Sequence, residues 1–263
     1  SATFTQVARG EDVTALREVL KTLLDNGGTL FDTAPGYGAS EEVAGRLVRE
    51  MRWADRLFWA TKVNVAGRGG SADPAVARAQ IETSFTRVGK AKIDLIQVHN
   101  LGDVPTQLPI LREFKERGRI RYLGVTTTFD QQYADLIRIM RNEPLDFIGV
   151  DYAIDGREVE REILPLAQER KIAVLAYAPF GRTRLFRRVS TRPLPEWAAE
   201  FDAKTWGQFF LKWVLGHPAI TTVTPATSQA KNMLDNIGGG IGRVPDQAMR
   251  TRMAAFIDAL PAA

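Results

Sequence analysis

The feature that most constrains this chain is a regular alternation of short apolar runs with longer amphipathic stretches. Seven runs are rich in Ile, Val, Leu, Phe and Tyr, and several are apolar on both faces, which is typical of parallel strands covered by helices. The expected strands are Thr29–Asp32, Leu57–Lys62, Ile93–His99, Ile120–Val125, Leu145–Val150, Ile172–Tyr177 and Ile220–Thr224. This pattern predicts an α/β fold with a parallel sheet.

Stretches with helical periodicity precede or separate these strands. The expected helices are Asp12–Asn26, Ser40–Arg52, Pro74–Val88, Gln107–Arg117, Asp130–Arg141, Glu158–Glu169 and Thr205–Gly216. Boundary signals support several of them. Asp73-Pro74 places a proline in a first turn, and Ser40 stands before two glutamates as a helix start. Asn26-Gly27 and Arg117-Gly118 are typical helix stops.

The seven strand–helix units follow one another without a proline- or serine-rich linker. We therefore expect a single domain over residues 1–263, and the spacing favours a (β/α)8 TIM barrel, which has about 250 residues, over two doubly wound halves. An eighth strand is needed before Asp12, and residues 1–11 lack a strand pattern, so the first strand is expected to precede the given chain. The run GGGIG at 238–242 follows a helix, which argues against a dinucleotide-binding fingerprint.

Composition excludes several classes of protein. The chain has no cysteine, so disulfides and thiolate metal sites are excluded, and no apolar run approaches the ~18 residues of a membrane span. The 35 basic residues lie among 31 acidic ones, and no basic stretch interleaved with aromatics suggests nucleic acid. A basic cluster at 182–192 is either a solvated loop or an anion-binding loop. We expect a cytoplasmic protein, although Ser1 is not a natural start and an export signal is not excluded.

Four polar side chains stand at or just beyond the ends of the first three expected strands. Asp32 ends the first strand and Tyr37 lies in the loop beyond it, while Lys62 and His99 end the next two. Each alone has an ordinary structural explanation, such as a loop cap, a packed ring, an ion pair or a structural histidine. Because active sites of (β/α)8 barrels lie at the C-terminal ends of the strands, the four together indicate a catalytic site.

The four residue types suit the reduction of a carbonyl group. An isolated phenol has a pKa of ~10, too high for easy proton exchange near neutrality, and a neighbouring ammonium favours the phenolate. A carboxylate can hold the ammonium in place, and an imidazole can orient a substrate oxygen by a hydrogen bond. The set has no nucleophile–base pair for acyl transfer and no ligand spacing typical of a metal site.

Six segments together resemble the successive motifs of the aldo-keto reductases. They are FDTAPGYGASEE, ATKV, IDLIQVHN, IRYLGVTT, AYAPFG and ATSQAKNMLDN, in family order and with family spacing over roughly residues 10–240. The resemblance implies a (β/α)8 barrel that usually binds NADPH without a Rossmann motif. It also implies that the family's opening hairpin and first strand precede residue 1. The matching catalytic tetrad is Asp32, Tyr37, Lys62 and His99.

The resemblance gives each tetrad member a role. It makes Tyr37 the general acid in carbonyl reduction and the base in alcohol oxidation. Lys62 promotes ionisation of the phenol, Asp32 positions Lys62, and His99 orients the carbonyl. The expected cofactor contacts are Thr126, Thr127, Tyr177, Pro179, Gly181, Arg182, Thr227, Gln229, Lys231, Asp235 and Asn236. Among them Tyr177 matches the aromatic that stacks on the nicotinamide, and Asn236 matches an adenine contact.

The chain departs from the family at positions that touch the cofactor. Thr126-Thr127 replaces the usual Ser-Asn, and Gly149 replaces the usual Gln, so the nicotinamide carboxamide loses its usual partners. Ala226 and Asn232 stand where a basic pair often holds the 2′-phosphate, with Lys231 next to them. We expect NADP(H) as the cofactor, with NAD(H) possible.

Two classes of function remain open at this point. The first is an NAD(P)H-dependent reductase of a small aldehyde or ketone, and the second is a cofactor-binding regulatory or sensor protein with little turnover. The intact tetrad favours the enzyme, whereas the altered carboxamide contacts favour the sensor. A non-redox barrel, such as a phosphate-sugar isomerase, would not explain Tyr37 beside Lys62. The physiological substrate and the oligomeric state are not encoded in any motif we recognise.

Overall fold

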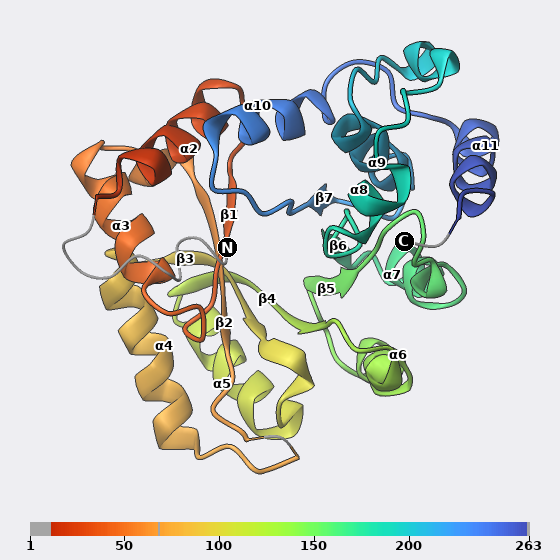
Figure 1. Cartoon of the computed structure of the whole chain (residues 1–263). Helices are drawn as coiled ribbons and strands as arrows, with labels where there is room; N and C mark the ends of the chain where they lie inside the picture. Colours follow the sequence, from red (N-terminus) through yellow and green to blue (C-terminus); the bar gives the residue numbers. More distant parts are fainter. Residues whose placement is uncertain (1–11, 68, 262–263) are drawn as a thin grey trace. The chain divides into compact units, whose positions relative to one another are not determined.

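The computed structural model describes residues 12–67 and 69–261, in which strands alternate with helices (Figure 1). The strands are β1 (Leu30–Asp32), β2 (Phe58–Val63), β3 (Ile93–Val98), β4 (Ile120–Thr127), β5 (Phe147–Asp151), β6 (Ala173–Tyr177) and β7 (Thr222–Val223). Their order in the sheet follows the sequence from β1 to β7. β1 to β4 pair in parallel, as do β6 and β7. The predicted α/β fold and all seven expected strands are therefore confirmed.

Helices follow the strands, as the periodicity predicted. They are α2 (Thr14–Asp25), α3 (Ser40–Glu50), α4 (Pro74–Val88), α5 (Val104–Glu116), α6 (Tyr133–Asn142), α7 (Ile163–Glu169), α8 (Arg184–Val189), α9 (Trp206–Leu215), α10 (Ala230–Gly238) and α11 (Gln247–Asp258). α8, α10 and α11 were not among the expected helices. The first of them is only six residues long, so its periodicity is too short to detect, and it carries three arginines of the basic cluster.

α3 begins at Ser40 and α4 at Pro74, as expected, whereas α5 begins earlier than expected. Asp73 caps α4, since its Oδ1 accepts from the backbone N–H groups of residues 75 and 76 at 2.7 and 3.2 Å. Ser40 does not cap α3, because the cap position is Ala39 and the Ser40 Oγ instead accepts from the Thr33 hydroxyl at 2.8 Å. α5 begins at Val104 rather than Gln107, because the proline after Val104 starts the helix.

The chain folds into two compact units. The first unit contains α2 through β4 together with residues 144–148 and 226–230. The second contains residues 128–143, 149–225 and 231–263. The expectation of a single domain over residues 1–263 stays a prediction, and each unit is described below by itself.

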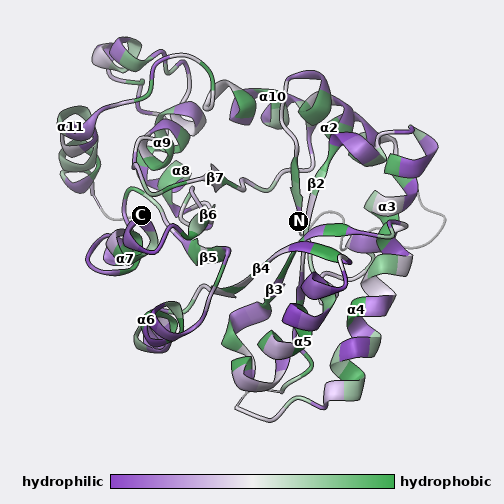
Figure 2. Ribbon diagram, turned by 180° about the vertical axis from the view of Figure 1, so that it is seen from behind, coloured by the Kyte–Doolittle hydropathy of each residue, from purple (hydrophilic) through white to green (hydrophobic). Residues whose placement is uncertain are grey.

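The core of the first unit lies between its strands and the helices that cover them. Strand residues such as Ala60, Leu95 and Val125 have no exposed surface. α4 buries residues 77, 81, 85 and 88, which share one helical face, and Figure 2 shows hydrophobic and hydrophilic residues alternating along this helix. This packing holds the C-terminal ends of β1, β2 and β3 in fixed register.

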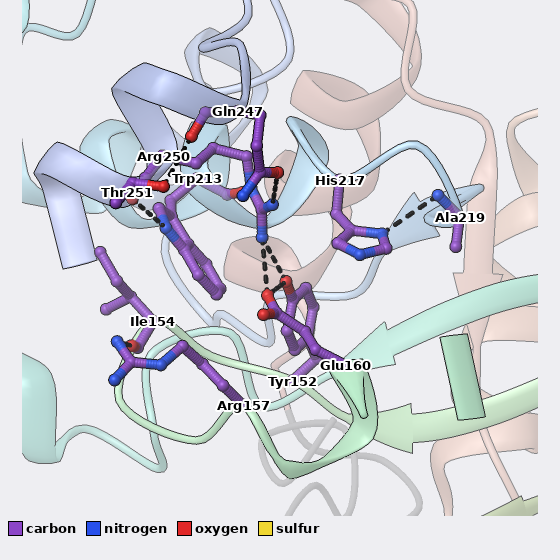
Figure 3. A network of polar contacts seen from close by, with 10 residues as sticks. All are labelled: Tyr152, Ile154, Arg157, Glu160, Trp213, His217, Ala219, Gln247, Arg250 and Thr251. Carbon is purple, nitrogen blue, oxygen red and sulfur yellow. Dashed lines mark hydrogen bonds and ion pairs between the residues drawn. The ribbon is translucent and has the colours of Figure 1, made fainter. Parts of the chain in front are cut away.

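The second unit is held together by aromatic packing and one buried arginine. Arg250 of α11 has 2% of its surface exposed, and its guanidinium lies 4.5 Å from the Trp213 ring centroid. It donates to the Glu160 carboxylate at 2.8 Å, to the Tyr152 hydroxyl and to the Trp213 carbonyl at 3.0 Å (Figure 3). Burial raises the pKa of Tyr152, so its hydroxyl stays protonated and donates to Glu160. The network fixes α11 against α9 and the residue that follows β5.

No helix among the described residues is long and apolar enough to cross a lipid bilayer.

Candidate active site

An ion pair between neighbouring strands forms the base of the candidate site. Asp32 is the last residue of β1, and Lys62 lies near the end of β2, which pairs with β1 in parallel. The Lys62 ammonium donates to both Asp32 oxygens, at 2.8 and 2.7 Å, and to the Thr33 carbonyl at 2.8 Å. The side chains are 2% and 11% exposed, so the pair is largely shielded from water. A buried ammonium in this position requires such partners.

Tyr37 and His99 complete a cluster around this ion pair. The Lys62 Nζ lies 5.2 Å from the centroid of the Tyr37 ring. The Tyr37 and His99 rings meet edge to face, with centroids 5.8 Å apart and an interplanar angle of 83°. The four residues that the sequence singled out are thus neighbours in the folded first unit.

The loop that carries Tyr37 is anchored at both ends. The Thr33 N–H donates to the Ala60 carbonyl of β2 at 2.9 Å, and the Thr33 hydroxyl donates to Ser40 at the start of α3. Between these anchors the Tyr37 N–H donates to the Ala34 carbonyl at 2.9 Å, which closes a turn. The ring is therefore presented from a short, bonded loop rather than from a free one.

The Asn64 side chain holds the backbone of His99 in place. Its Nδ2 donates to the His99 carbonyl at 2.9 Å, and its Oδ1 accepts from the Ala66 N–H at 3.0 Å. A Cβ at Gly102 would collide with the Asn64 side chain, so any larger residue there would displace this amide. Just beyond the histidine, Asn100 and Leu101 have φ values of 54° and 51°, a left-handed conformation that L-residues rarely adopt.

A second amide supports the same turn. Gln107 is fully buried, accepts from the Val65 N–H at 3.1 Å and donates to the Gly102 carbonyl. Asn64 and Gln107 therefore tie the turn that holds His99 to the residues after β2. Sequence analysis did not identify either residue, because an amide that holds the backbone leaves no pattern in the chain that distinguishes it from an exposed one.

Burial sets the charge of the histidine. Desolvation, with a smaller contribution from the Lys62 ammonium, lowers the pKa of His99 to about 4. The imidazole is consequently neutral near pH 7, with one nitrogen that donates and one that accepts. This charge state suits a group that orients a carbonyl oxygen, since an imidazolium would itself compete as a proton donor.

A pocket of about 480 Å³ opens beside the cluster. Its lining residues come from the Tyr37 loop, the end of β2, α4 and the turn after β3: Pro35, Gly36, Lys62, Asn64, Ala66, Gln80, Thr83, Arg87 and His99. This volume is within the ~300–1,000 Å³ typical of small-molecule sites. Two members of the tetrad therefore face a space large enough for a small substrate.

The expected carboxamide contacts differ in exposure. Thr126 and Thr127, at the end of β4 in the first unit, are buried, and the Thr126 Oγ1 accepts from the Asn100 N–H at 3.2 Å. Tyr177 ends β6 in the second unit and is half-buried. A Cβ at Gly149 would collide with the Tyr177 ring and lie 2.6 Å from its hydroxyl. The ring thus occupies the space that a side chain at Gly149 would need.

The segment with the expected cofactor contacts Pro179, Gly181 and Arg182 follows β6. Pro179 and Gly181 are buried, and Arg182 is exposed, with its guanidinium 2.7 Å from Asp151. Arg184 forms a two-point pair with Asp155 at 2.6 and 2.9 Å. Two arginines of the basic cluster are therefore ion-paired to carboxylates within their own unit. Whether the cluster serves as an anion-binding loop stays a prediction.

The expected contacts to the adenosine end lie in or near α10. Thr227, Gln229 and Lys231 are at least partly exposed, and the Gln229 N–H donates to the Thr227 hydroxyl at 3.2 Å. Asn236 is half-buried. Asp235 accepts from the Thr205 hydroxyl and from the Gln208 amide at 2.9–3.0 Å. Lys231 is thus available to an anion, whereas Asp235 also fixes the start of α9.

No group of three or more His, Cys, Asp or Glu side chains in the described part of the chain could hold a metal ion.

Comparison with known proteins identifies the family. The sequence profile of the Aldo/keto reductase family matches residues 2–251. The chain therefore belongs to the aldo/keto reductases. Aldo-keto reductase YhdN of Bacillus subtilis (strain 168) is 33% identical over 182 residues, which are 66% of this chain and 54% of that protein. The matched segment thus spans about half the length of that relative.

Solved structures share the fold. The glycerol dehydrogenase of Gluconobacter oxydans superposes with a TM-score of 0.78 at 24% identity, covering 98% of this chain and 89% of that one. An aldo-keto reductase of Klebsiella pneumoniae in complex with NADPH gives 0.74 at 23% identity, covering 94% and 87%. At these identities the likeness establishes the α/β fold of the aldo-keto reductase barrels.

Proposed function

We propose that this protein is an NADP(H)-dependent oxidoreductase that reduces an aldehyde or ketone to an alcohol, with Tyr37 as the general acid. The observation that carries the proposal is the buried Lys62–Asp32 ion pair beneath the Tyr37 ring, with His99 edge-on to the same ring. Family membership and the NADPH complex of the Klebsiella pneumoniae relative support the reaction class and the cofactor.

Each side chain has a defined part in the proton transfer. The Tyr37 hydroxyl delivers a proton to the carbonyl oxygen, and the Lys62 ammonium stabilises the phenolate that remains. Asp32 holds that ammonium by two hydrogen bonds, at 2.8 and 2.7 Å. A bound nicotinamide would supply the hydride chemistry for the carbonyl carbon, and these side chains handle the proton.

His99 acts as an orienting donor. Because its pKa is lowered to about 4, it carries no spare proton to give near pH 7. A neutral imidazole can still donate its single N–H to the carbonyl oxygen and fix the angle at which that oxygen meets Tyr37. The proton therefore comes from the Tyr37 phenol, and the His99 imidazole orients the carbonyl oxygen that receives it.

Residues of this chain fit the cofactor in part. The half-buried Tyr177 ring offers a face for the nicotinamide, and the buried Thr126 and Thr127 hydroxyls replace the usual Ser-Asn pair. Arg182 and Lys231 are exposed cations suited to phosphates. The remaining proposed contacts are Pro179, Gly181, Thr227, Gln229, Asp235 and Asn236.

A sensor protein with a bound cofactor is the second candidate. The observation that favours it is the Tyr177 ring lying against Gly149, where the family has a Gln that holds the carboxamide. A less restrained nicotinamide would bind without reaching a reactive orientation.

Steady-state oxidation of NADPH with a panel of aldehydes and ketones separates the two candidates. Turnover with any carbonyl compound supports the reductase. Cofactor binding at low micromolar concentration with no turnover across the panel supports the sensor and contradicts the reductase.

A further inference from the structure

Three residues of α4 line the same pocket as Lys62 and His99. Gln80, Thr83 and Arg87 are spaced by three and four residues, so the helix presents them on one face. None of them belongs to the family motifs, and neither the tetrad nor the cofactor contacts use them. They form a wall of the substrate pocket that the proposed chemistry leaves unexplained.

The charged side chains that line this pocket are all positive. No carboxylate is among the described residues that line it, whereas Lys62 and Arg87 are cations. Asp32 neutralises Lys62 at 2.7 Å, which leaves Arg87 as the cation facing the pocket. An anion that enters therefore meets a positive group in the lining, and the nearest acid to that group, Glu41, lies behind it rather than in the lining.

Arg87 is only weakly neutralised by its own partner. Its Nη1 lies 3.4 Å from Glu41 Oε2, at the long limit of a hydrogen bond. Glu41 is 1% exposed, and its other oxygen accepts from the Thr61 hydroxyl at 2.7 Å. The contact with Glu41 is the single side-chain bond of this guanidinium among the described residues. The side chain is 38% exposed and lines the pocket, so the remaining donors of the guanidinium are accessible to a ligand there.

Gln80 adds an oriented donor beside the arginine. Its Oε1 accepts from the Asn64 N–H at 3.0 Å, which fixes the side chain and turns the amide nitrogen into a donor for other groups. Thr83 donates its hydroxyl to the Ala79 carbonyl at 2.8 Å, so it does not compete for those donors. The α4 wall therefore combines one cation and one amide donor with no acid.

We propose that Arg87 and Gln80 bind an anionic substituent, a carboxylate or a phosphate, at the end of the carbonyl substrate opposite the reacting group. Charge-assisted hydrogen bonds from a guanidinium fork are the strong polar contacts in such a site. The inference rests on the proposed reductase activity, because it places the reacting carbonyl at His99 and Tyr37.

The test uses matched carbonyl substrates that differ only in charge. ω-Oxo acids of two to six carbons are compared with their methyl esters, and glyceraldehyde 3-phosphate is compared with glyceraldehyde. For the chain length that spans the pocket, kcat/KM should be about tenfold higher for the acid than for its ester. The phosphate pair shows whether the larger dianion is preferred over the carboxylate.

Gln80→Glu tests the anion site most directly, because it changes the charge of the wall and keeps its hydrogen bond. Glutamate keeps the acceptor for the Asn64 N–H and adds a negative charge to the wall, so the acid-to-ester ratio should fall about tenfold. Arg87→Met should lower the same ratio, and Arg87→Lys should retain part of it. Because Arg87→Met leaves the buried Glu41 unpaired, its unfolding temperature is measured and the Arg87→Met/Glu41→Gln double variant is compared.

Arg78→Met is the matched control. Arg78 lies on the same helix, pairs with Glu113 at 2.6 Å and does not line the pocket. Equal kcat/KM for acids and esters in the wild type, or an acid-to-ester ratio that Gln80→Glu leaves intact, overturns the anion site. The absence of turnover with acids and esters alike contradicts the reductase itself, so the two failures are distinguishable.

Discussion

The Lys62 ammonium and the Asp32 carboxylate face each other across two neighbouring parallel strands, with both carboxylate oxygens within 2.8 Å of Nζ. The Thr33 carbonyl accepts a further hydrogen bond at 2.8 Å, so the ammonium is bonded on the side of β1. The Tyr37 ring centroid lies 5.2 Å from the same atom. A single buried cation thus lies between the carboxylate that balances its charge and the ring of Tyr37.

Replacing Tyr37 by phenylalanine should remove the proton donor and little else. The ring remains to contact His99 and Lys62, so we expect cofactor affinity within about threefold of wild type and turnover lower by about 10²–10⁴-fold. Stopped-flow and steady-state NADPH oxidation measure the loss, and fluorescence titration measures cofactor binding. A Phe variant that keeps more than about a tenth of wild-type turnover would remove Tyr37 from the role of general acid.

Lys62→Met should be at least as damaging, and it should also destabilise the fold. It leaves Asp32 as a carboxylate that is 11% exposed and without its partner. Loss of one member of a buried pair typically costs about 3–5 kcal/mol. Urea unfolding measures this cost.

The double variant Lys62→Met/Asp32→Asn should recover much of the stability while remaining inactive, because the buried charge is gone but the phenol still lacks its ammonium. Equal stability of the single and double variants would contradict an electrostatic origin of the loss.

His99 should make the protein less stable in mild acid. Its pKa is about 4 in the folded chain against 6.5 when free, so below pH 6.5 the unfolded state binds the proton more readily. The folded state therefore loses stability as the pH falls from 6.5 to about 4, by at most about 3 kcal/mol.

His99→Gln should flatten that part of the stability curve relative to wild type. The pKa of His217 is also lowered by burial, and it contributes in the same direction, but it is present in both proteins and cancels in the comparison. Urea midpoints at pH 7, 6, 5 and 4 give the difference. Parallel curves for the two proteins would show that His99 is not the buried neutral group.

The sequence predicted the tetrad but not the groups that hold it. Asp32, Tyr37, Lys62 and His99 were identifiable because their chemistry is unusual at the ends of apolar strands. Their placement side by side follows from the order of parallel strands, which local patterns encode well.

The side chains that support the tetrad could not be predicted from the sequence, because they bond to backbone atoms. Asn64 holds a carbonyl of His99, and Gln107 bonds residues that lie 42 and five positions away. Such contacts depend on which loops meet after folding. The start of α5 was missed for a local reason, because Pro105 opens the helix while a second proline inside it obscures its periodicity.

Gly149→Ala should displace the Tyr177 ring. The added methyl group would collide with the ring in the present conformation, so the aromatic face must move. If that face stacks on the nicotinamide, NADPH affinity should fall about 2- to 10-fold. Gly67→Ala is the control, since a Cβ at Gly67 meets nothing within 4 Å. Unchanged NADPH affinity in Gly149→Ala would argue against a stacking role for Tyr177.

The final prediction concerns the choice between NADP(H) and NAD(H). Lys231 is exposed at the start of α10, and it is the cation nearest in sequence to Thr227, Ser228 and Gln229, where relatives often supply an Arg and a Lys. We expect NADP(H) to bind more tightly than NAD(H), by a margin smaller than two cations would give. A charge-assisted hydrogen bond is worth about 1.5–3 kcal/mol, so Lys231→Ala should cut the NADP-to-NAD affinity ratio about 10- to 100-fold.

Fluorescence titration of both cofactors on wild type, Lys231→Ala and Lys92→Ala measures this ratio. Lys92 is exposed before β3 and serves as the matched control for loss of one surface cation. Arg182 follows β6 and would act on the pyrophosphate, which both cofactors share, so Arg182→Met should weaken both equally. If Lys231→Ala also lowers the affinity for both cofactors by the same factor, Lys231 does not bind the 2′-phosphate. A wild-type preference for NAD(H) would contradict the expectation from the family.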